Sequence, residues 1–272
     1  MIPETGEYRL AVDHLTKRYG GHHVVEDLTF SAEPGRVTGF LGPNGSGKST
    51  TMKVLLDLAA ADHGSATVGG VRYRDLADPA GTVGVVLEPN AFHPGRSGRN
   101  HLRTLALAAG RTDERVDETL DTVGLSREAA RRRVGTYSLG MKQRLSLAGA
   151  LLTDPSVLVL DEPANGLDPQ GIRELRDLLR SRAAQGNTVL VSSHLLTEVQ
   201  HLVDDVVVIN QGRLVTTGTV ASLTDSSARV RATRADVLTE RLTSAGARVE
   251  PTEADALVVS GLTTDEIGDI AH

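Results

Sequence analysis

The feature that most constrains this chain is a glycine-rich loop directly behind a short apolar segment. Residues 42–50 read Gly-Pro-Asn-Gly-Ser-Gly-Lys-Ser-Thr, and they follow Val37-Thr-Gly-Phe-Leu41. Glycines at this spacing let backbone N–H groups curl around a phosphate without interference from a Cβ. The residues from Thr51 onward predict a helix whose positive N-terminal end faces the bound anion. A strand, a phosphate-binding loop and a helix in this order predict a nucleotide-binding α/β core.

The loop supplies side chains for phosphate and metal as well as backbone donors. Lys48 is placed to reach the β- and γ-phosphates of a triphosphate, and the Ser49 hydroxyl to ligate Mg²⁺. An ordinary glycine-rich turn would show this spacing by chance with odds on the order of one in a hundred, so nucleotide binding is the stronger interpretation. The residues expected to hold the nucleotide are Gly42, Pro43, Asn44, Gly45, Ser46, Gly47, Lys48, Ser49 and Thr50.

Length and composition place this loop in an ordinary globular protein. The chain has 272 residues, a formal net charge of −6 and no cysteine. The charge gives no global basic field, so no nucleic-acid partner is expected. Disulfides and thiolate metal sites are excluded, and no apolar run approaches the roughly 18–20 residues that cross a bilayer. The N-terminus shows no signal-peptide pattern, so we expect a cytoplasmic chain.

Apolar periodicity divides the chain into parts. Residues 7–220 predict the nucleotide-binding domain, which begins with an antiparallel β subdomain and carries an inserted α-helical subdomain at about 89–153. From residue 155 strand and helix alternate, which is typical of a parallel sheet. Helices are expected from Pro169 to about Ala184, where Asp168-Pro169 is a good N-cap and first-turn pair, and from about Leu195 to Val203. Residues 221–272 predict a small α+β appendage that reads as incomplete, because it ends at Ile270-Ala-His before a further strand and helix. The expected strands of the main domain are Tyr8–Leu15, Val24–Ser31, Val37–Leu41, Ala66–Tyr73, Thr82–Leu87, Val157–Leu160, Thr188–Ser192, Val206–Ile209 and Leu214–Thr217.

Two acidic residues follow a buried strand in Val157-Leu-Val-Leu-Asp161-Glu162. In P-loop enzymes an aspartate at a strand end holds Mg²⁺. A second acid beside it is placed to polarise the attacking water as a general base. Two acids after an apolar run are common in turns, but their combination with the upstream loop predicts a site for nucleotide hydrolysis.

A second candidate phosphate site lies in Tyr137-Ser-Leu-Gly-Met-Lys-Gln-Arg144. Ser138 is a natural N-cap for a helix that continues to about Leu152, and a helix N-terminus with the backbone of Gly140 nearby can bind phosphate. Standing alone, this stretch is a plain helix cap. One chain cannot easily wrap both sites around a single γ-phosphate, so the pattern predicts a dimer.

Taken in order, these motifs resemble the ATP-binding subunit of ABC transporters over residues 7–220. The resemblance implies a Walker A loop, a Walker B strand and an ATPase of the P-loop (RecA-like) α/β fold. It also implies a role for each further motif: the signature at Tyr137–Met141, the catalytic glutamate at Glu162, the D-loop at Ala164–Asp168, the switch histidine at His194 and the adenine-stacking aromatic at Tyr19. Tyr19 could instead be a packed strand residue, and His194 a capped core histidine.

Three positions depart from the usual family pattern. Leu139 replaces a glycine of the signature and Met141 replaces its glutamine, whereas Ser138 and Gly140 are kept. Glu88 stands at the Q-loop glutamine position. A carboxylate there can ligate Mg²⁺, but it adds negative charge and cannot donate a hydrogen bond. These departures resemble the bacitracin and lantibiotic self-protection transporters and related drug exporters.

The resemblance therefore implies a complete set of roles and partners. ATP would be hydrolysed with Glu162, His194 and Lys48 as catalytic residues. Mg²⁺ would be held by Ser49, Asp161 and Glu88. The partners would be a second copy of the chain and a separate transmembrane permease contacted through Pro89–Leu102, which would put the chain peripherally on the cytoplasmic face of the membrane. Phe92, His93 and Arg96 are expected to be exposed there as candidate contacts, or as plain solvent-facing loop residues.

The alternative is a soluble ABC ATPase bound to nucleic acid or ribosomes. Ribosomal members usually carry two cassettes in one chain, and here there is a single Walker A loop. Chromosome-associated members need a long coiled-coil insertion, for which the segment between the two Walker motifs leaves no room.

Overall fold

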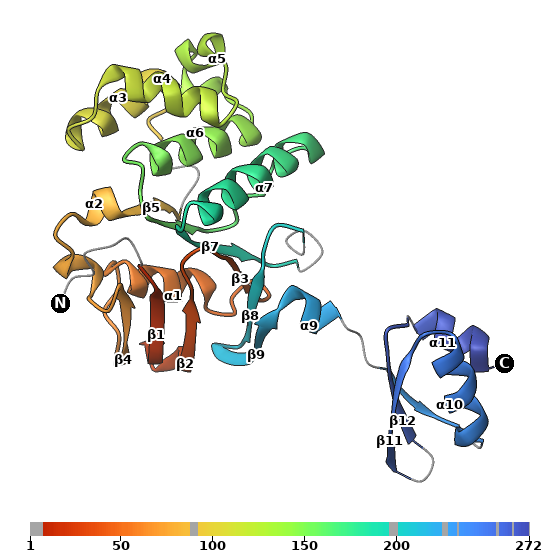
Figure 1. The fold of residues 1–272 in the computed structure, drawn as a ribbon. Helices are drawn as coiled ribbons and strands as arrows, with labels where there is room; N and C mark the ends of the chain where they lie inside the picture. Colours follow the sequence, from red (N-terminus) through yellow and green to blue (C-terminus); the bar gives the residue numbers. More distant parts are fainter. Residues whose placement is uncertain are drawn as a thin grey trace. The chain divides into compact units, whose positions relative to one another are not determined.

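The chain forms two compact units, Met1–Thr217 and Gly218–His272, in the computed structural model (Figure 1). The structure describes residues 8–87, 92–195, 201–224, 228–232, 234–253, 256–262 and 264–271. Glu88 and most of the helix expected from Leu195 to Val203 therefore lie outside the described residues.

A six-stranded sheet in the order β5-β6-β7-β3-β8-β9 forms the centre of the N-terminal unit. Neighbouring strands from β5 to β8 pair in parallel. Every residue of β3 and β6 is buried, as expected for parallel strands covered on both faces. Because parallel strands end at the same edge, the loops that follow β3, β6 and β7 meet there. The strands are β3 (Val37–Leu41), β5 (Val83–Val86), β6 (Val157–Leu160), β7 (Thr188–Ser193), β8 (Asp205–Asn210) and β9 (Arg213–Thr219).

A three-stranded antiparallel sheet in the order β2-β1-β4 forms the predicted β subdomain. Its strands are β1 (Leu10–Tyr19), β2 (His22–Ala32) and β4 (His63–Val68). Phe30 of β2 stacks on Phe40 of β3 with ring centroids 4.8 Å apart, so the two sheets share one core. The prediction of a strand over Ala66–Tyr73 was wrong at its C-terminal end. The chain turns at Gly69 and Gly70, both at positive φ, and Tyr73 begins a 3₁₀ turn, η1 (Tyr73–Asp75).

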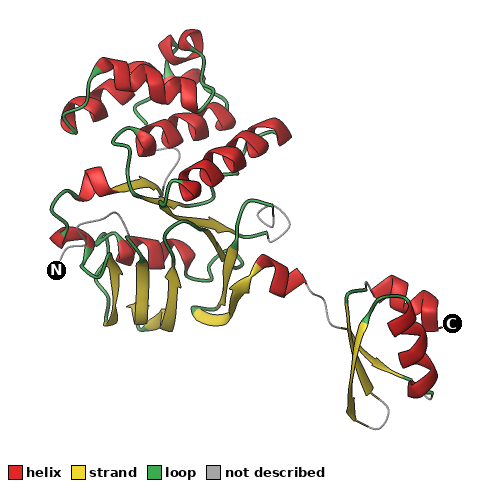
Figure 2. Ribbon diagram, viewed as in Figure 1, coloured by secondary structure: helices red, strands yellow, loops and turns green. Residues whose placement is uncertain are grey.

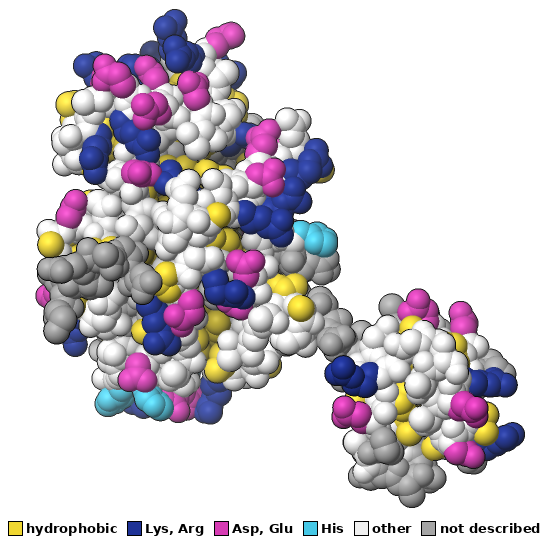
Figure 3. All heavy atoms as spheres, viewed as in Figure 1, with side chains coloured by type: hydrophobic (Ala, Val, Ile, Leu, Met, Phe, Trp, Pro, Cys, Tyr) yellow, Lys and Arg dark blue, Asp and Glu magenta, His cyan; other side chains and the backbone are white. Residues whose placement is uncertain are grey.

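Helices gather beyond the sheet as the predicted inserted subdomain, from α3 to α6 (Figure 2). Within the described part of the chain, none of the helices is both long enough and apolar enough to cross a membrane. Figure 3 shows acidic and basic side chains interspersed over this subdomain on the face in view. The helical elements of the unit are α1 (Lys48–Leu55), α2 (Pro79–Thr82), α3 (Gly98–Ala108), α4 (Asp113–Thr122), α5 (Arg127–Arg131), η2 (Val134–Thr136), α6 (Leu139–Leu151) and α7 (Pro169–Ala184).

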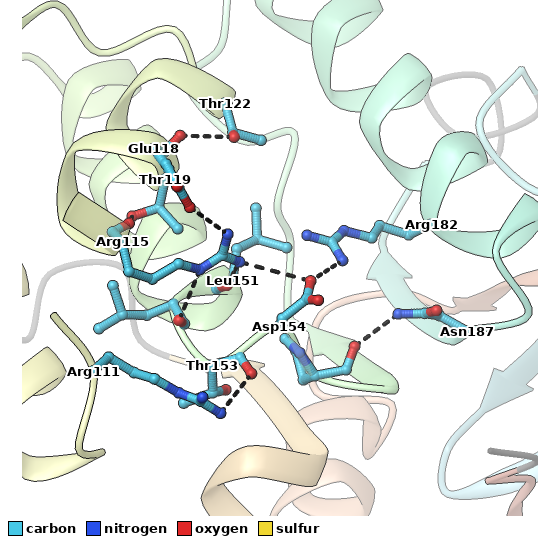
Figure 4. A network of polar contacts seen from close by, with 12 residues as sticks. Arg111, Arg115, Glu118, Thr119, Thr122, Leu151, Thr153, Asp154, Arg182 and Asn187 are labelled. Carbon is cyan, nitrogen blue, oxygen red and sulfur yellow. Dashed lines mark hydrogen bonds and ion pairs between the residues drawn. The ribbon is translucent and has the colours of Figure 1, made fainter. Parts of the chain in front are cut away.

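A polar network joins the helical subdomain to the sheet where α6 ends (Figure 4). Arg115 of α4 donates to the carbonyl of Leu151 at 2.9 Å, and its guanidinium also lies 3.6 Å from the Asp154 carboxylate. Asp154 has φ +55 and pairs with Arg182 of α7 on its other side. The hydrogen bond from Arg182 lowers the pKa of Asp154. The carboxylate therefore links α4, α6 and α7 at one point.

The C-terminal unit is an antiparallel sheet in the order β10-β12-β11 with helices packed on it. Its core consists of apolar residues from α10, α11 and the strands, among them Leu242, Val259 and Ile267. This unit is α+β, as expected for this part of the chain. The elements are α9 (Val220–Thr224), β10 (Ala228–Arg231), α10 (Ala235–Ser244), β11 (Arg248–Glu253), β12 (Ala256–Ser260) and α11 (Thr264–Ala271).

Candidate functional site

The phosphate-binding loop begins at the carboxyl end of β3 and is held from three sides. Gly42 donates its N–H to the carbonyl of Ser193 at 3.2 Å, and Gly212 donates to the carbonyl of Ser46 at 2.9 Å. A Cβ at Gly42 would lie 2.4 Å from the carbonyl oxygen of Ile209. Gly47 has φ +105, and a Cβ there would lie 2.7 Å from the carbonyl oxygen of Val24. Both glycines are thus required by close approach of backbone.

The loop leads into α1 without a side-chain cap, with Gly47 at the N-cap position. The first N–H groups of a helix have no partner within the helix, so an uncapped N-terminus can bind an anion. Lys48, the first residue of α1, is buried, and its ammonium donates to the carbonyl of Gly42 at 2.6 Å. The cation is therefore positioned over the loop, where a phosphate would sit.

A pocket opens above this loop. The residues predicted from the sequence that line it are Asn44, Gly45, Gly47, Lys48, Ser49, Thr50, Asp161 and Glu162, joined by Val24 of β2. Helix N-terminus, lysine and glycine backbone converge on one space, which fits a triphosphate. The loop after β3 and the loop after β6 are thus brought together as expected, although a long stretch of sequence separates them.

Ser49 and Asp161 form the candidate metal site. The Ser49 hydroxyl donates to Asp161 Oδ2 at 2.6 Å. The other carboxylate oxygen, Oδ1, accepts a hydrogen bond from the Ser192 hydroxyl. Mg²⁺ is usually held by one or two protein oxygens and keeps several waters, so this hydroxyl and carboxylate fit that ion. Glu88, the third predicted ligand, lies outside the described residues.

The Glu162 carboxylate lies between the loop lysine and the switch histidine. Its Oε2 is 2.9 Å from His194 Nδ1, and its Oε1 is 3.9 Å from Lys48 Nζ. The Glu162 backbone has φ +49, the left-handed region that a non-glycine residue occupies at a cost. Its N–H donates to the Ser192 hydroxyl at 2.9 Å. The three residues predicted to be catalytic are thus brought together by β3, β6 and β7.

The signature segment caps its own helix and contacts the D-loop. The Ser138 hydroxyl accepts from the N–H of Met141 at 3.2 Å and so caps α6. A Cβ at Gly166 would lie 2.4 Å from Leu139 Cδ2, and a Cβ at Gly140 would lie 2.9 Å from the Gly166 carbonyl. Leu139 thus occupies the space that a glycine leaves in the D-loop. Ser138 and Gly140 do not line the pocket over their own Walker A loop.

The predictions for Tyr19 and for the segment after the Q-loop are only partly confirmed. Tyr19 ends β1 with half its surface exposed, and Lys17 Nζ lies 5.1 Å from the centroid of its ring. Stacking on adenine stays a prediction. His93 and Arg96 are exposed as expected. Phe92 is not: it is half-buried, and its ring packs edge to face with that of His101, centroids 4.9 Å apart.

Sequence reasoning missed Ser192 and Gln143. Ser192 is fully buried at the end of β7 and bonds both acidic residues of the Walker B motif. Gln143 of α6 is also fully buried, and its Nε2 lies 3.5 Å from the Glu162 carbonyl oxygen. A serine pair at the end of an apolar strand could have drawn attention to Ser192, whereas nothing local marks Gln143.

This geometry defines a class of protein. A P-loop at the end of a central parallel strand, a strand-end aspartate beside its serine and a glutamate beside a histidine define a P-loop ATPase. An antiparallel β subdomain and an inserted helical subdomain accompany this core.

Comparisons with known proteins place the chain within that class. The model of the family described as "ABC transporter" matches residues 25–165, and a model described as "Domain of unknown function (DUF8746)" matches residues 226–272. The chain is 40% identical over 209 residues to the uncharacterized ABC transporter ATP-binding protein YhcH of Bacillus subtilis, covering 76% of this chain and 68% of that one. It is 39% identical to the bacitracin transport ATP-binding protein BcrA of Enterococcus faecalis, covering 77% and 68%. It is 36% identical to the lantibiotic transport ATP-binding protein SrtF of Streptococcus pyogenes, covering 76% and 89%.

Solved structures agree in fold. One ATP-binding subunit of an ABC transporter superposes with a TM-score of 0.70 at 28% identity, covering 79% of this chain and 91% of that chain. A dimeric bacterial ABC transporter cassette superposes with a TM-score of 0.71 at 20% identity, covering 78% and 98%. The chain therefore belongs to the ABC transporter family, whose ATP-binding cassettes bind and hydrolyse ATP.

Proposed function

We propose that this chain is the ATP-hydrolysing subunit that powers export of a drug, antibiotic or peptide through a separate membrane subunit. The observation that carries the hydrolytic role is the Glu162 carboxylate, 2.9 Å from His194 and 3.9 Å from Lys48. A carboxylate in this position is suited to accept a proton from the attacking water. His194 orients that carboxylate, and Lys48 with the loop N–H groups stabilises charge on the phosphates. The export role is supported by the names of the bacitracin and lantibiotic transport relatives.

The metal has a defined place in this proposal. Ser49 and Asp161 would hold Mg²⁺, which neutralises negative charge on the nucleotide when bound. Ser192 fixes the Asp161 carboxylate from the side opposite Ser49. Glu88 would add a third oxygen ligand. We expect Glu88→Gln to keep ATP hydrolysis and to alter its Mg²⁺ dependence or its coupling to transport; unchanged ATPase and transport would show that Glu88 has no special role.

Two copies of the chain would complete each site. Ser138 and Gly140 lie outside the pocket of their own chain, so they are free to contribute to the γ-phosphate site of a second copy. Electrostatic stabilisation would then be complete only after the copies close on two ATP molecules. Tyr19 would stack on adenine.

The membrane partner would contact the segment Pro89–Leu102, of which the structure describes residues 92–102. This loop is tied to the segment before the signature: Val134 donates to the carbonyl of Arg96 and Gly135 to that of Pro94, both at 2.9 Å. Because Ser138 follows Gly135 by only a few residues, a displacement of the loop by the membrane subunit would also move Ser138. The chain would act at the cytoplasmic face of the membrane, and residues 221–272 would form an accessory domain.

Three measurements test the proposal. The full chain should co-purify with a membrane subunit, and Glu162→Gln should dimerise in the presence of ATP because it binds without hydrolysing. Nucleic acid should not stimulate the ATPase activity of the wild-type chain. Binding to ribosomes or DNA without a membrane partner would instead support the soluble alternative.

A further inference from the structure

The backbone of Glu162 is held in a costly conformation from two sides. Its φ of +49 lies in the left-handed region, which costs a non-glycine residue about 1–3 kcal/mol unless its surroundings impose it. On the amino side, the Glu162 N–H donates to the Ser192 hydroxyl on β7. On the carboxyl side, the Glu162 carbonyl accepts from the N–H of Asn165 at 3.1 Å and faces the Gln143 amide at 3.5 Å. The direction of the catalytic carboxylate therefore depends on contacts with β7 and α6.

Burial of the Gln143 side chain lowers the stability of the fold. Its side chain is fully buried in α6, and its Oε1 has no hydrogen-bond partner among the residues that the structure describes. A buried polar atom without a partner costs about 1–3 kcal/mol. An apolar residue of the same shape would avoid that cost. What the amide provides, and an apolar residue would not, is the contact from Nε2 to the Glu162 carbonyl.

The same helix carries the signature at its start. Ser138 caps α6, and Gln143 follows about one and a half turns later, roughly 7 Å along the helix axis. A shift of the Ser138 end toward the γ-phosphate of a second copy would therefore move the Gln143 amide. The distance of 3.5 Å lies beyond the usual range of an N–H···O hydrogen bond, so a small shift that brings the amide and the carbonyl together would form that bond.

We propose that Gln143 is a positioning residue that turns the Glu162 carboxylate into its catalytic orientation when α6 engages ATP on the partner copy. The inference rests on the proposed function, in which the signature serves the second copy. Through Gln143, engagement of one ATP by Ser138 is transmitted to the general base that acts on the other ATP, within one chain.

The test compares Gln143→Met with the wild-type full chain in ATP hydrolysis. Methionine keeps the shape of the side chain and removes the donor. We expect kcat to fall roughly ten- to a hundredfold, the loss that follows a small misplacement of a catalytic group. The KM for ATP, and the ATP concentration that dimerises each protein in a Glu162→Gln background, should stay within about twofold. Thr38→Val is the matched control, because Thr38 is another buried side chain whose hydroxyl lacks a partner in the described structure.

The outcomes distinguish a positioning role of Gln143 from a purely structural one. If Gln143 is only a core residue, Gln143→Met will be as stable as the wild type or more so, with kcat within about twofold, and the proposal is overturned. A parallel loss of kcat, ATP affinity and dimerisation also overturns it. If Gln143→Met does not fold, Gln143→Leu gives the same comparison. If the wild type itself does not hydrolyse ATP, the proposed function fails rather than this inference.

Discussion

Removal of the Ser192 hydroxyl should show how much the site depends on a fully buried residue of β7 that lies outside the phosphate-binding loop. Ser192 is fully buried; it donates to the Asp161 carboxylate and accepts from the N–H of Glu162. The first bond has a charged acceptor and is worth about 1.5–3 kcal/mol, and the second leaves a part-buried N–H unpaired at about 1 kcal/mol or more. We therefore expect Ser192→Ala to lower the free energy of unfolding by about 2.5–4 kcal/mol. We also expect kcat for ATP hydrolysis to fall at least about tenfold, because both Walker B acids lose a fixed partner.

The matched control lies at the other end of the same strand. Thr188 is also fully buried in β7, and its hydroxyl donates to the carbonyl of Tyr8 at 2.6 Å. Thr188→Val should cost about 1 kcal/mol, as one neutral hydrogen bond does, and should leave kcat within about twofold. Urea unfolding and steady-state ATP hydrolysis measure both quantities. Equal losses of stability in the two variants, or unchanged kcat in Ser192→Ala, would refute the reasoning.

Three further predictions concern the helical subdomain, the D-loop and the switch histidine. Asp154→Asn, which tolerates the left-handed backbone, should lower the free energy of unfolding by up to about 1 kcal/mol at neutral pH, since the pair with Arg182 is partly exposed. The pKa of Asp154 is lowered in the folded chain. The difference in free energy of unfolding between the two proteins, measured by urea titration, should therefore disappear as the pH falls below the ordinary aspartate value of about 3.9 and through the lowered value. A difference that persists in acid would contradict this prediction. Gly166→Ala should weaken ATP-dependent dimerisation in the Glu162→Gln background because its Cβ would meet Leu139 and its φ is +77, and Leu139→Gly should partly restore it; no effect of either change would be evidence against the contact. His194→Ala should lower kcat about a hundredfold with little change in ATP binding, since Glu162 loses the partner that orients its carboxylate; loss of nucleotide binding alone would assign the histidine a different role.

Several elements could be predicted from the sequence because their information is local. Strands β3 and β6 and helix α7 have the predicted bounds, since buried parallel strands read as continuous apolar runs and Asp168-Pro169 is a strong helix start. The Asp168 carboxylate accepts from the N–H of Gly171 at 2.8 Å, as an N-cap should. The end of β4 was misjudged because the strand-favouring residues Val71 and Tyr73 follow the two glycines at which the chain turns.

The sequence by itself determined the chemistry of this protein, because the P-loop, the Walker B acids and the capped signature helix are each contiguous stretches of chain. Only the tertiary structure decided how they act together. The order β6-β7-β3 inserts β7 between the two Walker strands, so Ser192 bonds both acids although nothing in the chain order links them. The approach of Gln143 to the Glu162 carbonyl likewise depends on where α6 packs. Apolar patterning tells which residues are buried but is the same for every strand order, so such neighbours are settled by packing in three dimensions.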